Sequence, residues 1–145
     1  MYPVLNLPKA DIRIKTENGK SKVFDIVRQK WYILNPEEWV RQHWIHALIT
    51  HSSYPQGLFE IESSINLDGM RKRFDIIVRK KDLGIHILIE CKAPEVPIDS
   101  DTLLQASKYA RILKPDYIFL SNGIQHYMFK NEEGNLSIIH KIPDY

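Results

Sequence analysis

The sequence predicts an α/β domain in which a mixed β-sheet is flanked by helices. Two runs rich in β-branched residues, 74–79 and 85–92, are joined by a short segment that ends in glycine, which is typical of a β-hairpin. Helix signals lie on both sides of this hairpin, at 35–51 and 101–113. An apolar run at 116–121 follows the second helix, and this crossover makes it parallel to the second hairpin strand.

The composition indicates one globular domain. Of the 145 residues, 43% are hydrophobic and 26% are charged, so the chain can bury a sizeable core. It has no run of about 18 apolar residues and no signal-peptide pattern, so we expect no membrane association. The single cysteine, Cys91, excludes an internal disulfide and fits a reducing cytoplasm, which is the expected location.

Residues 1–34 are expected to form a β arm. The segment 11–16 alternates between polar and apolar residues, an Asn-Gly pair follows as a strong turn signal, and 22–26 can return as a second strand. Residues 28–34 can add a third short strand. Nothing in this arm suggests chemistry, so we expect it to support the fold or to mediate dimerisation.

The core, residues 35–130, opens with a helix that should run to about His51. Asn35 can cap this helix, a proline fills the first helical position, and Glu38 occupies the third. In that place Glu38 can close a capping box and complement the helix dipole without any further role. The alternating run 58–65 should then form the strand before the central hairpin.

The turn length of the central hairpin predicts its register. A four-residue turn at 81–84 pairs Lys80 with Ile85, and counting back from that pair places Asp75 opposite Glu90. Directly opposite residues have Cβ atoms about 4.5–5.5 Å apart. We therefore expect the two carboxylates to turn to one side at the open end of the hairpin.

Lys92 joins this pair because side chains alternate along a strand, so it shares the face of Glu90 while Cys91 points the other way. Like charges opposite one another destabilise a sheet, and a hard cation such as Mg²⁺ or Mn²⁺ would remove that cost. Lys92 can then orient water or neutralise charge on a phosphoryl group. The alternative is plain ion pairing of Asp75 with Arg73 or Lys92, and of Glu90 with Lys92.

Six cations lie within eleven residues around Asp75, and such a block suits contact with phosphate. Arg71, Lys72 and Arg73 precede Asp75 directly. The other three, at 79–81, are equally well explained as a solvated hairpin tip. The net charge of +2 is too small by itself to indicate nucleic-acid binding.

The second helix, capped by Asp99 or Ser100, places Gln105 and Tyr109 one turn apart on one face. An amide and a phenol in this arrangement can reach the catalytic groups or a DNA phosphate, or can simply form a helix surface. After the parallel strand, an Asn-Gly turn leads into a returning strand, and the C-terminal edge, 131–145, completes a last hairpin.

The pattern Asp75-x₁₄-Glu90-x-Lys92 resembles the PD-(D/E)xK nuclease superfamily, with Phe74 where a proline is usual. Beyond it, Glu-Cys-Lys-Ala-Pro-Glu from residue 90, Gln-Ala-Ser-Lys-Tyr from 105 and Ser-Asn-Gly from 121 are similar to a particular family. That family is the N-terminal nuclease domain of type I restriction enzyme R (HsdR) subunits. The similarity extends over about 36–129.

The resemblance implies a restriction-endonuclease-like αβββαβ core that cleaves DNA as a metal-dependent endonuclease. It assigns metal ligation to Asp75, Glu90 and the Cys91 carbonyl, water activation to Lys92, a further acid to Glu38, and contact with the site or a backbone phosphate to Gln105 and Tyr109. Family partners would be a helicase or translocase motor and other restriction-modification subunits. No G-x-x-x-x-G-K-[ST] loop occurs, so the chain cannot drive translocation itself and is either a stand-alone relative or an isolated domain.

Two other functions fit the same residues. One is a homodimeric nuclease of the Holliday-junction resolvase type, which shares this fold and chain length. The other is a nucleic-acid-binding domain that keeps the motif but no longer cleaves.

Overall fold

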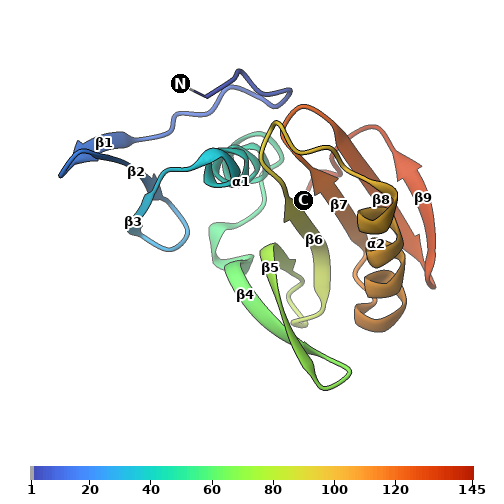
Figure 1. Cartoon of the computed structure of the whole chain (residues 1–145). Helices are drawn as coiled ribbons and strands as arrows, with labels where there is room; N and C mark the ends of the chain where they lie inside the picture. The colour runs from blue at the N-terminus through green and yellow to red at the C-terminus, as the bar shows by residue number, and fades with distance from the viewer. Residues whose placement is uncertain (1) are drawn as a thin grey trace.

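The computed structural model describes residues 2–145 as a six-stranded mixed sheet and a separate three-stranded sheet (Figure 1). The strands are β1 (Ile14–Glu17), β2 (Lys20–Asp25), β3 (Lys30–Ile33), β4 (Phe59–Leu67), β5 (Met70–Arg79), β6 (Ile85–Cys91), β7 (Tyr117–Ser121), β8 (His126–Glu132) and β9 (Asn135–Ile139). The helices are α1 (Pro36–His46) and α2 (Ser100–Leu113), with a π-helical turn η1 (Ala47–His51) and a 3₁₀ turn η2 (Gln56–Leu58).

The large sheet has the order β4-β5-β6-β7-β8-β9. Strands β6 and β7 are parallel, and the other neighbouring strands are antiparallel. The predicted α/β class is thus confirmed, with the expected succession α1, β4, β5, β6, α2, β7 and a C-terminal hairpin, β8–β9. Among residues 2–145, the helices lack the length and apolar character that a membrane-spanning helix requires.

Two hydrophobic cores hold the helices to the two faces of this sheet. On one face, Trp44 of α1 is fully buried and its ring centroid lies 5.5 Å from that of Phe119. On the other face, Ala106 and Ala110 of α2 pack against the layer that contains Leu88. Each large side chain buried in this way contributes about 1.5–3 kcal/mol to folding. The helices therefore fix the sheet from both sides.

Helix α1 begins where the sequence predicts. The side chain of Asn35 accepts a hydrogen bond from the backbone N–H of Glu38 at 2.7 Å, so Asn35 caps the helix. The helix ends as the π-helical turn η1, which reaches the expected last residue, His51. Helix α2 is capped in the same way by Asp99, whose carboxylate accepts from the N–H of Thr102 at 2.9 Å.

The central hairpin keeps the predicted register in its middle and departs from it at the turn. Ile76 pairs with Ile89, as the predicted register requires, and the pairing ends there, one residue before Asp75 and Glu90. The predicted pair of Lys80 with Ile85 was wrong, because Arg79 pairs with Ile85 instead. The register shifts at this point, where one extra residue of β6 forms a bulge.

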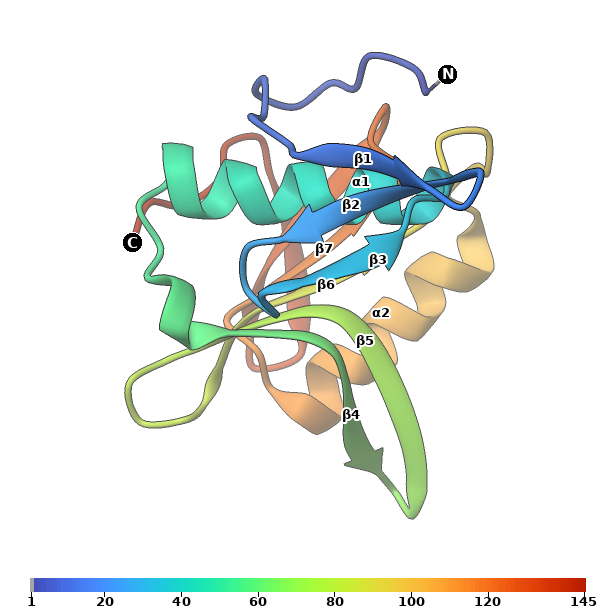
Figure 2. The same cartoon turned by 90° about the vertical axis from the view of Figure 1, so that its left-hand side faces the viewer.

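Strand β5 begins at Met70, four residues before the predicted start at Phe74, and pairs with β4 from there onward. Its pairing with β6 covers only Ile76 to Arg79. The first half of β5 and the end of β4 therefore continue past the sheet as a two-stranded ribbon, which projects below the rest of the molecule in Figure 2.

Gly123 forms a close contact that only glycine permits. It lies at the turn before β8 with φ of +86°, and an added Cβ would come within 2.8 Å of Leu5 Cδ2 and 3.1 Å of Val40 Cγ2. Gly69, in the turn between β4 and β5, has nearly the same φ of +82° but nothing within 4 Å of the corresponding position.

These two glycines give a matched test of packing. Gly69→Ala should lower the free energy of unfolding by about 1–2 kcal/mol, the cost of a left-handed backbone. Gly123→Ala should cost about 1–3 kcal/mol more, because the new methyl group also overpacks the core. Urea unfolding of both variants measures the difference, and equal losses would contradict the packing argument.

Candidate active site

A polar cavity of about 210 Å³ lies where β5 leaves the sheet. Asp75, Glu90 and Lys92 all border it, so the structure brings together the residues singled out in the central hairpin. Elements α1, β4, β5 and β6 supply its lining, which consists of Glu37, Arg41, Glu62, Lys72, Arg73, Phe74, Asp75, Glu90, Cys91 and Lys92.

The carboxylate of Asp75 is held by hydrogen bonds from strand β6 and from helix α1. Its Oδ2 accepts a hydrogen bond from the backbone N–H of Cys91 at 2.9 Å. Its Oδ1 accepts from Arg41 Nη2 of α1 at 2.6 Å. The following residue, Ile76, also packs in the α1-side core, so the alternation of side chains breaks here. Opposite this point, Glu62 of β4 has a left-handed backbone with φ of +51°.

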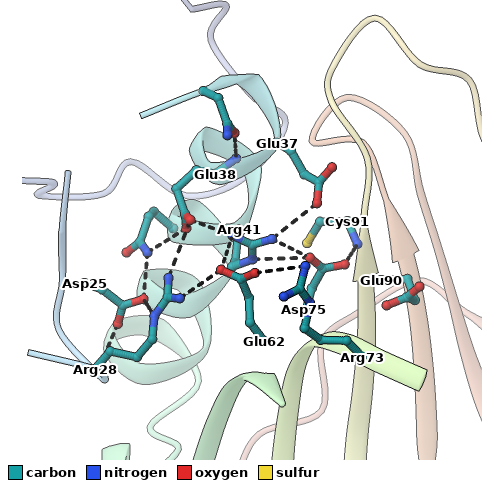
Figure 3. A network of polar contacts seen from close by, with 12 residues as sticks. Asp25, Arg28, Glu37, Glu38, Arg41, Glu62, Arg73, Asp75, Glu90 and Cys91 are labelled. Atoms are coloured by element: carbon teal, nitrogen blue, oxygen red, sulfur yellow. Dashed lines mark hydrogen bonds and ion pairs between the residues drawn. The ribbon is translucent and has the colours of Figure 1, made fainter. Parts of the chain in front are cut away.

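Glu90 approaches the cavity from the other face of the sheet, to the right of Asp75 in Figure 3. Its Oε2 lies 3.2 Å from Lys72 Nζ, and its buried Oε1 has no hydrogen-bond partner within residues 2–145. Burial and then the charge of Asp75 raise the pKa of Glu90 to about 7, although Lys72 opposes the shift. The two carboxylates thus border one cavity from the two faces of the sheet, rather than from one side as expected.

Lys92 follows β6 and is half-buried at the cavity wall. Its backbone N–H donates to the carbonyl of Ser121 at 2.8 Å, which fixes the chain beside β7. Within residues 2–145 its ammonium forms no ion pair. The nearby carboxylates have other partners: Asp75 is paired with Arg41 and Glu90 with Lys72. The two carboxylates therefore form ion pairs with cations other than those named by the ion-pair alternative.

Glu38 does not border the cavity. Its buried carboxylate accepts hydrogen bonds from Arg41 Nη1 at 2.6 Å and Gln42 Nε2 at 3.0 Å. The preceding residue, Glu37, points into the cavity instead and lies 3.2 Å from Arg41 Nη2 (Figure 3). Burial and then the charge of Asp75 raise the pKa of Glu37.

The sequence did not distinguish Glu37 from Glu38. Both lie within one turn of Arg41, at i,i+4 and i,i+3, and both contact its guanidinium. Consecutive helical residues differ by about 100° in direction, and only Glu37 borders the cavity. The acid that α1 supplies to this cavity is therefore Glu37.

Arg41 connects the acids of the cavity. Its guanidinium contacts Glu37, Glu38, Glu62 and Asp75, and only 7% of its side chain is exposed. Burial opposes its charge, but Glu38 and Asp75 outweigh that effect and raise the pKa of Arg41. The guanidinium thus joins α1, β4 and β5 into one polar cluster.

The β arm belongs to the same cluster, which the sequence did not indicate. Arg28 lies between β2 and β3, 2.8 Å from Asp25 Oδ2 and 2.9 Å from Glu62 Oε1. Asp25 is fully buried and also accepts from Gln42 Nε2 at 2.9 Å. The arm therefore supports the wall of the cavity through its charges.

Gln105 and Tyr109 do not line the cavity. The hydroxyl of Tyr109 donates to Gln105 Oε1 at 3.5 Å, and Gln105 is exposed. The Tyr109 ring meets that of Phe74 edge-on at 5.2 Å, and Phe74 is a lining residue. Tyr109 therefore supports the wall of the cavity from α2. Of the three predicted phosphate-contacting cations in β5, Lys72 and Arg73 border the cavity, whereas Arg71 is exposed outside it.

The cavity contains two carboxylates, Asp75 and Glu90, which are the type of ligand that a hard divalent cation takes. Within residues 2–145, no group of three or more His, Cys, Asp or Glu side chains is arranged to hold a metal ion. Mg²⁺ needs fewer protein ligands, since it is commonly held by one or two carboxylates with water. Glu90 Oε1 is a buried acceptor without a partner. Burial raises the pKa of the Cys91 thiol, so its carbonyl suits a hard cation better than its sulfur.

A larger cavity, about 520 Å³, lies at the other end of β5 and is lined in part by Lys80, His86 and Asp116. None of the predicted site residues reaches it. The smaller polar cavity is therefore the candidate active site.

Comparisons with known proteins agree with this fold. The sequence profile of the family described as "Type I restriction enzyme R protein N terminus (HSDR_N)" matches residues 36–143, from the start of α1 to beyond β9. The chain therefore belongs to this family, as the sequence motifs indicated. A comparison with curated proteins found no match.

The fold also resembles a solved structure described as "The fragment structure of a putative HsdR subunit of a type I restriction enzyme from Vibrio vulnificus YJ016". The TM-score is 0.56 at 19% sequence identity, over 77% of this chain. The chain spans 24% of the length of that protein, so the similarity concerns one part of it.

Asp25 should make the stability of the domain dependent on pH. Burial alone would raise its pKa, but hydrogen bonds from the Arg28 backbone and Gln42, together with the Arg28 charge, outweigh burial and lower it. A lowered pKa stabilises the fold above the ordinary aspartate value of about 4, and this contribution is lost as the pH falls through the folded-state pKa.

Asp25→Asn should therefore cost about 1–3 kcal/mol at pH 7 and less at pH 3, where the wild-type carboxylate also begins to be protonated. Urea unfolding at the two pH values checks this. Asp68→Asn, the same change in an exposed turn that tolerates Asn, is the control and should stay within about 0.5 kcal/mol. A penalty for Asp25→Asn that grows on acidification would contradict the assignment.

Proposed function

We propose that this domain is a metal-dependent endonuclease that hydrolyses phosphodiester bonds in DNA. The observation that carries the proposal is the convergence of Asp75, Glu90 and Lys92 on one polar cavity. Membership of the type I restriction enzyme R family supports it, because restriction requires DNA cleavage.

Mg²⁺ or Mn²⁺ would be held by the carboxylates of Asp75 and Glu90 and by the carbonyl of Cys91. A cation bound there would polarise the scissile phosphate and lower the pKa of a bound water. The mutual repulsion of Asp75 and Glu90, which contributes to the raised pKa of Glu90, is relieved by a positive ion between them. Glu37, in place of Glu38, is the further acid available to the site.

Lys92 has the role of a positioned cation. Lys92 borders the cavity and has no acidic partner within ion-pair distance among residues 2–145, so its ammonium is available to a substrate oxygen or an attacking water. Stabilising charge on the phosphoryl oxygens is the kind of electrostatic effect that reduces a barrier by several kcal/mol. Three cations suit contact with the flanking phosphates: Lys72 and Arg73, which border the cavity, and Arg71, which is exposed outside it. Gln105 is also exposed and is available for such a contact.

The family context also suggests partners. A type I restriction R subunit would place this domain beside a DNA-translocating motor and other restriction-modification subunits. The motor would deliver the duplex, and the cavity would cut it.

One observation favours a second function, a DNA-binding domain that does not cleave. Both carboxylates proposed as metal ligands already have cationic partners, Asp75 with Arg41 and Glu90 with Lys72. If these ion pairs are permanent, they neutralise the carboxylates without a metal. The two functions differ in metal binding and in the effect of removing Lys92.

Metal binding should stabilise the protein. At a Mn²⁺ concentration 100 times the dissociation constant, linkage adds about 2.7 kcal/mol and raises the melting temperature. Glu90→Gln, which keeps the shape of the side chain, should remove that increase, whereas Glu95→Gln in the exposed loop after β6 should retain it. Differential scanning calorimetry with and without Mn²⁺ makes the measurement. An unchanged increase in Glu90→Gln would place the metal elsewhere.

Lys92→Ala should separate cleavage from binding. We expect its turnover on linear, nicked or branched DNA with Mg²⁺ to fall by roughly 10²–10³-fold, the usual cost of losing one electrostatic stabiliser. Metal and DNA binding should persist, because Asp75 and Glu90 remain. Lys81→Ala at the exposed β5–β6 turn is the control for charge loss. Wild-type cleavage by Lys92→Ala would contradict the proposed role.

A further inference from the structure

Beyond Asp75, β5 continues with β4 alone as a two-stranded ribbon formed by residues 63–74, here named the β4–β5 ribbon (Figure 2). Strand β6 pairs with β5 only from Ile76 onward, so nothing extends the sheet on that side of the ribbon. At about 3.4 Å per residue, the ribbon reaches roughly 14 Å from Phe74 to Met70. A two-residue Asp-Gly turn with φ of +50° and +82° closes its tip.

The two faces of the ribbon differ in chemistry. Paired residues share a face, and one face carries Ile65 and Leu67, which pack in the α2-side core. The opposite face, here named the arginine face, pairs Ser64 with Arg73 and Asn66 with Arg71, and all four side chains are exposed.

Within residues 2–145, Arg71 forms no ion pair, and the one acid near Arg73 is Glu62 at 3.8 Å. The arginine face therefore presents two guanidinium groups that are weakly paired or unpaired inside the domain. Charged side chains also protect exposed strands from pairing with other chains. That explanation does not account for the position of the arginine face, which leads along the two strands to Glu62 and Asp75 at the border of the candidate active site.

Accepting DNA hydrolysis as proposed above, we infer that the β4–β5 ribbon docks in a groove of duplex DNA with its arginine face and so positions the strand over the cavity. A two-stranded antiparallel ribbon fits the major groove, which is about 12 Å wide. Exposed guanidinium groups suit phosphate oxygens along that groove. The arginine face has no aromatic side chain, and single strands are usually bound by stacking on aromatic rings. The preferred partner is therefore a duplex.

Affinity measurements without divalent cations test the ribbon independently of cleavage. Arg71→Gln should weaken binding of a labelled 30-base-pair duplex by roughly 3- to 10-fold and reduce the slope of log affinity against log salt by about 0.9. Lys81→Gln removes the same charge from the turn at the other end of β5 and should change affinity less than about 2-fold. Fluorescence anisotropy from 50 to 200 mM salt measures both.

Thiol protection tests where the duplex lies. Met70 at the ribbon tip is 74% exposed and Leu83 in the β5–β6 turn is 75% exposed, so cysteine at either position should react equally in the free protein. The native Cys91 is buried and gives little background. The duplex should protect Met70→Cys from alkylation and leave Leu83→Cys reactive, whereas a 30-nucleotide single strand should protect neither.

Equal effects of Arg71→Gln and Lys81→Gln, equal protection at the two tips, stronger binding of single-stranded DNA or RNA, or no duplex binding would each overturn the ribbon proposal. A cleavage assay on the same duplex with Mg²⁺ distinguishes a failure of the ribbon proposal from a failure of the nuclease proposal. Ribbon-dependent binding without cleavage would leave the ribbon standing and refute the nuclease. Cleavage that Arg71→Gln does not alter, at subsaturating duplex, would refute the ribbon alone.

Discussion

The ion pair between Arg41 and Asp75 is the interaction on which the arrangement of this domain's polar centre depends. Its 2.6 Å contact joins helix α1 to the strand that leaves the sheet, and the same guanidinium reaches Glu62 on the edge strand. Through Glu62 the cluster continues to Arg28 of the β arm. Arg41 and Arg28 together thus connect helix α1, the large sheet and the β arm, and the contact of Asp75 with Arg41 ties its position to the packing of α1.

Burying such a charged cluster has a free-energy cost, although the cluster connects several elements. A buried charge whose partner is removed typically destabilises a protein by about 3–5 kcal/mol, whereas the intact pair contributes little beyond an apolar replacement. The cluster therefore contributes more to geometry than to stability, which comes mainly from the two hydrophobic cores. A cation bound as proposed would share the carboxylates of Asp75 and Glu90 with Arg41 and Lys72, so its affinity would depend on the strength of those ion pairs.

The sequence predicted those features of the fold that depend on turn length, helix capping and chain connectivity. Turn length predicted the register in the middle of the hairpin, where Ile76 pairs with Ile89, although the pairing at the turn itself differs; capping predicted the start of α1, and the crossover through α2 predicted that β7 runs parallel to β6. The parts it did not predict depend on distant packing. Choosing Glu37 over Glu38 requires knowing which face of α1 meets the sheet. The alternation of side chains fails at Asp75, where the neighbouring edge strand has a left-handed backbone at Glu62. The ion-pair partner of Asp75, Arg41, comes from a helix far away in the sequence.

The left-handed backbone at Glu62 has a consequence for how this fold can vary. A non-glycine residue in that conformation costs about 1–2 kcal/mol, and Gly or Asn would adopt it more easily. Either replacement would remove the carboxylate that binds Arg28 and Arg41, so relief of local strain and integrity of the charged cluster demand opposite substitutions. Removing the partner of a buried charge costs about 3–5 kcal/mol, which exceeds the strain that either replacement would relieve. The charged cluster therefore favours glutamate at this position despite its unfavourable backbone torsion angle.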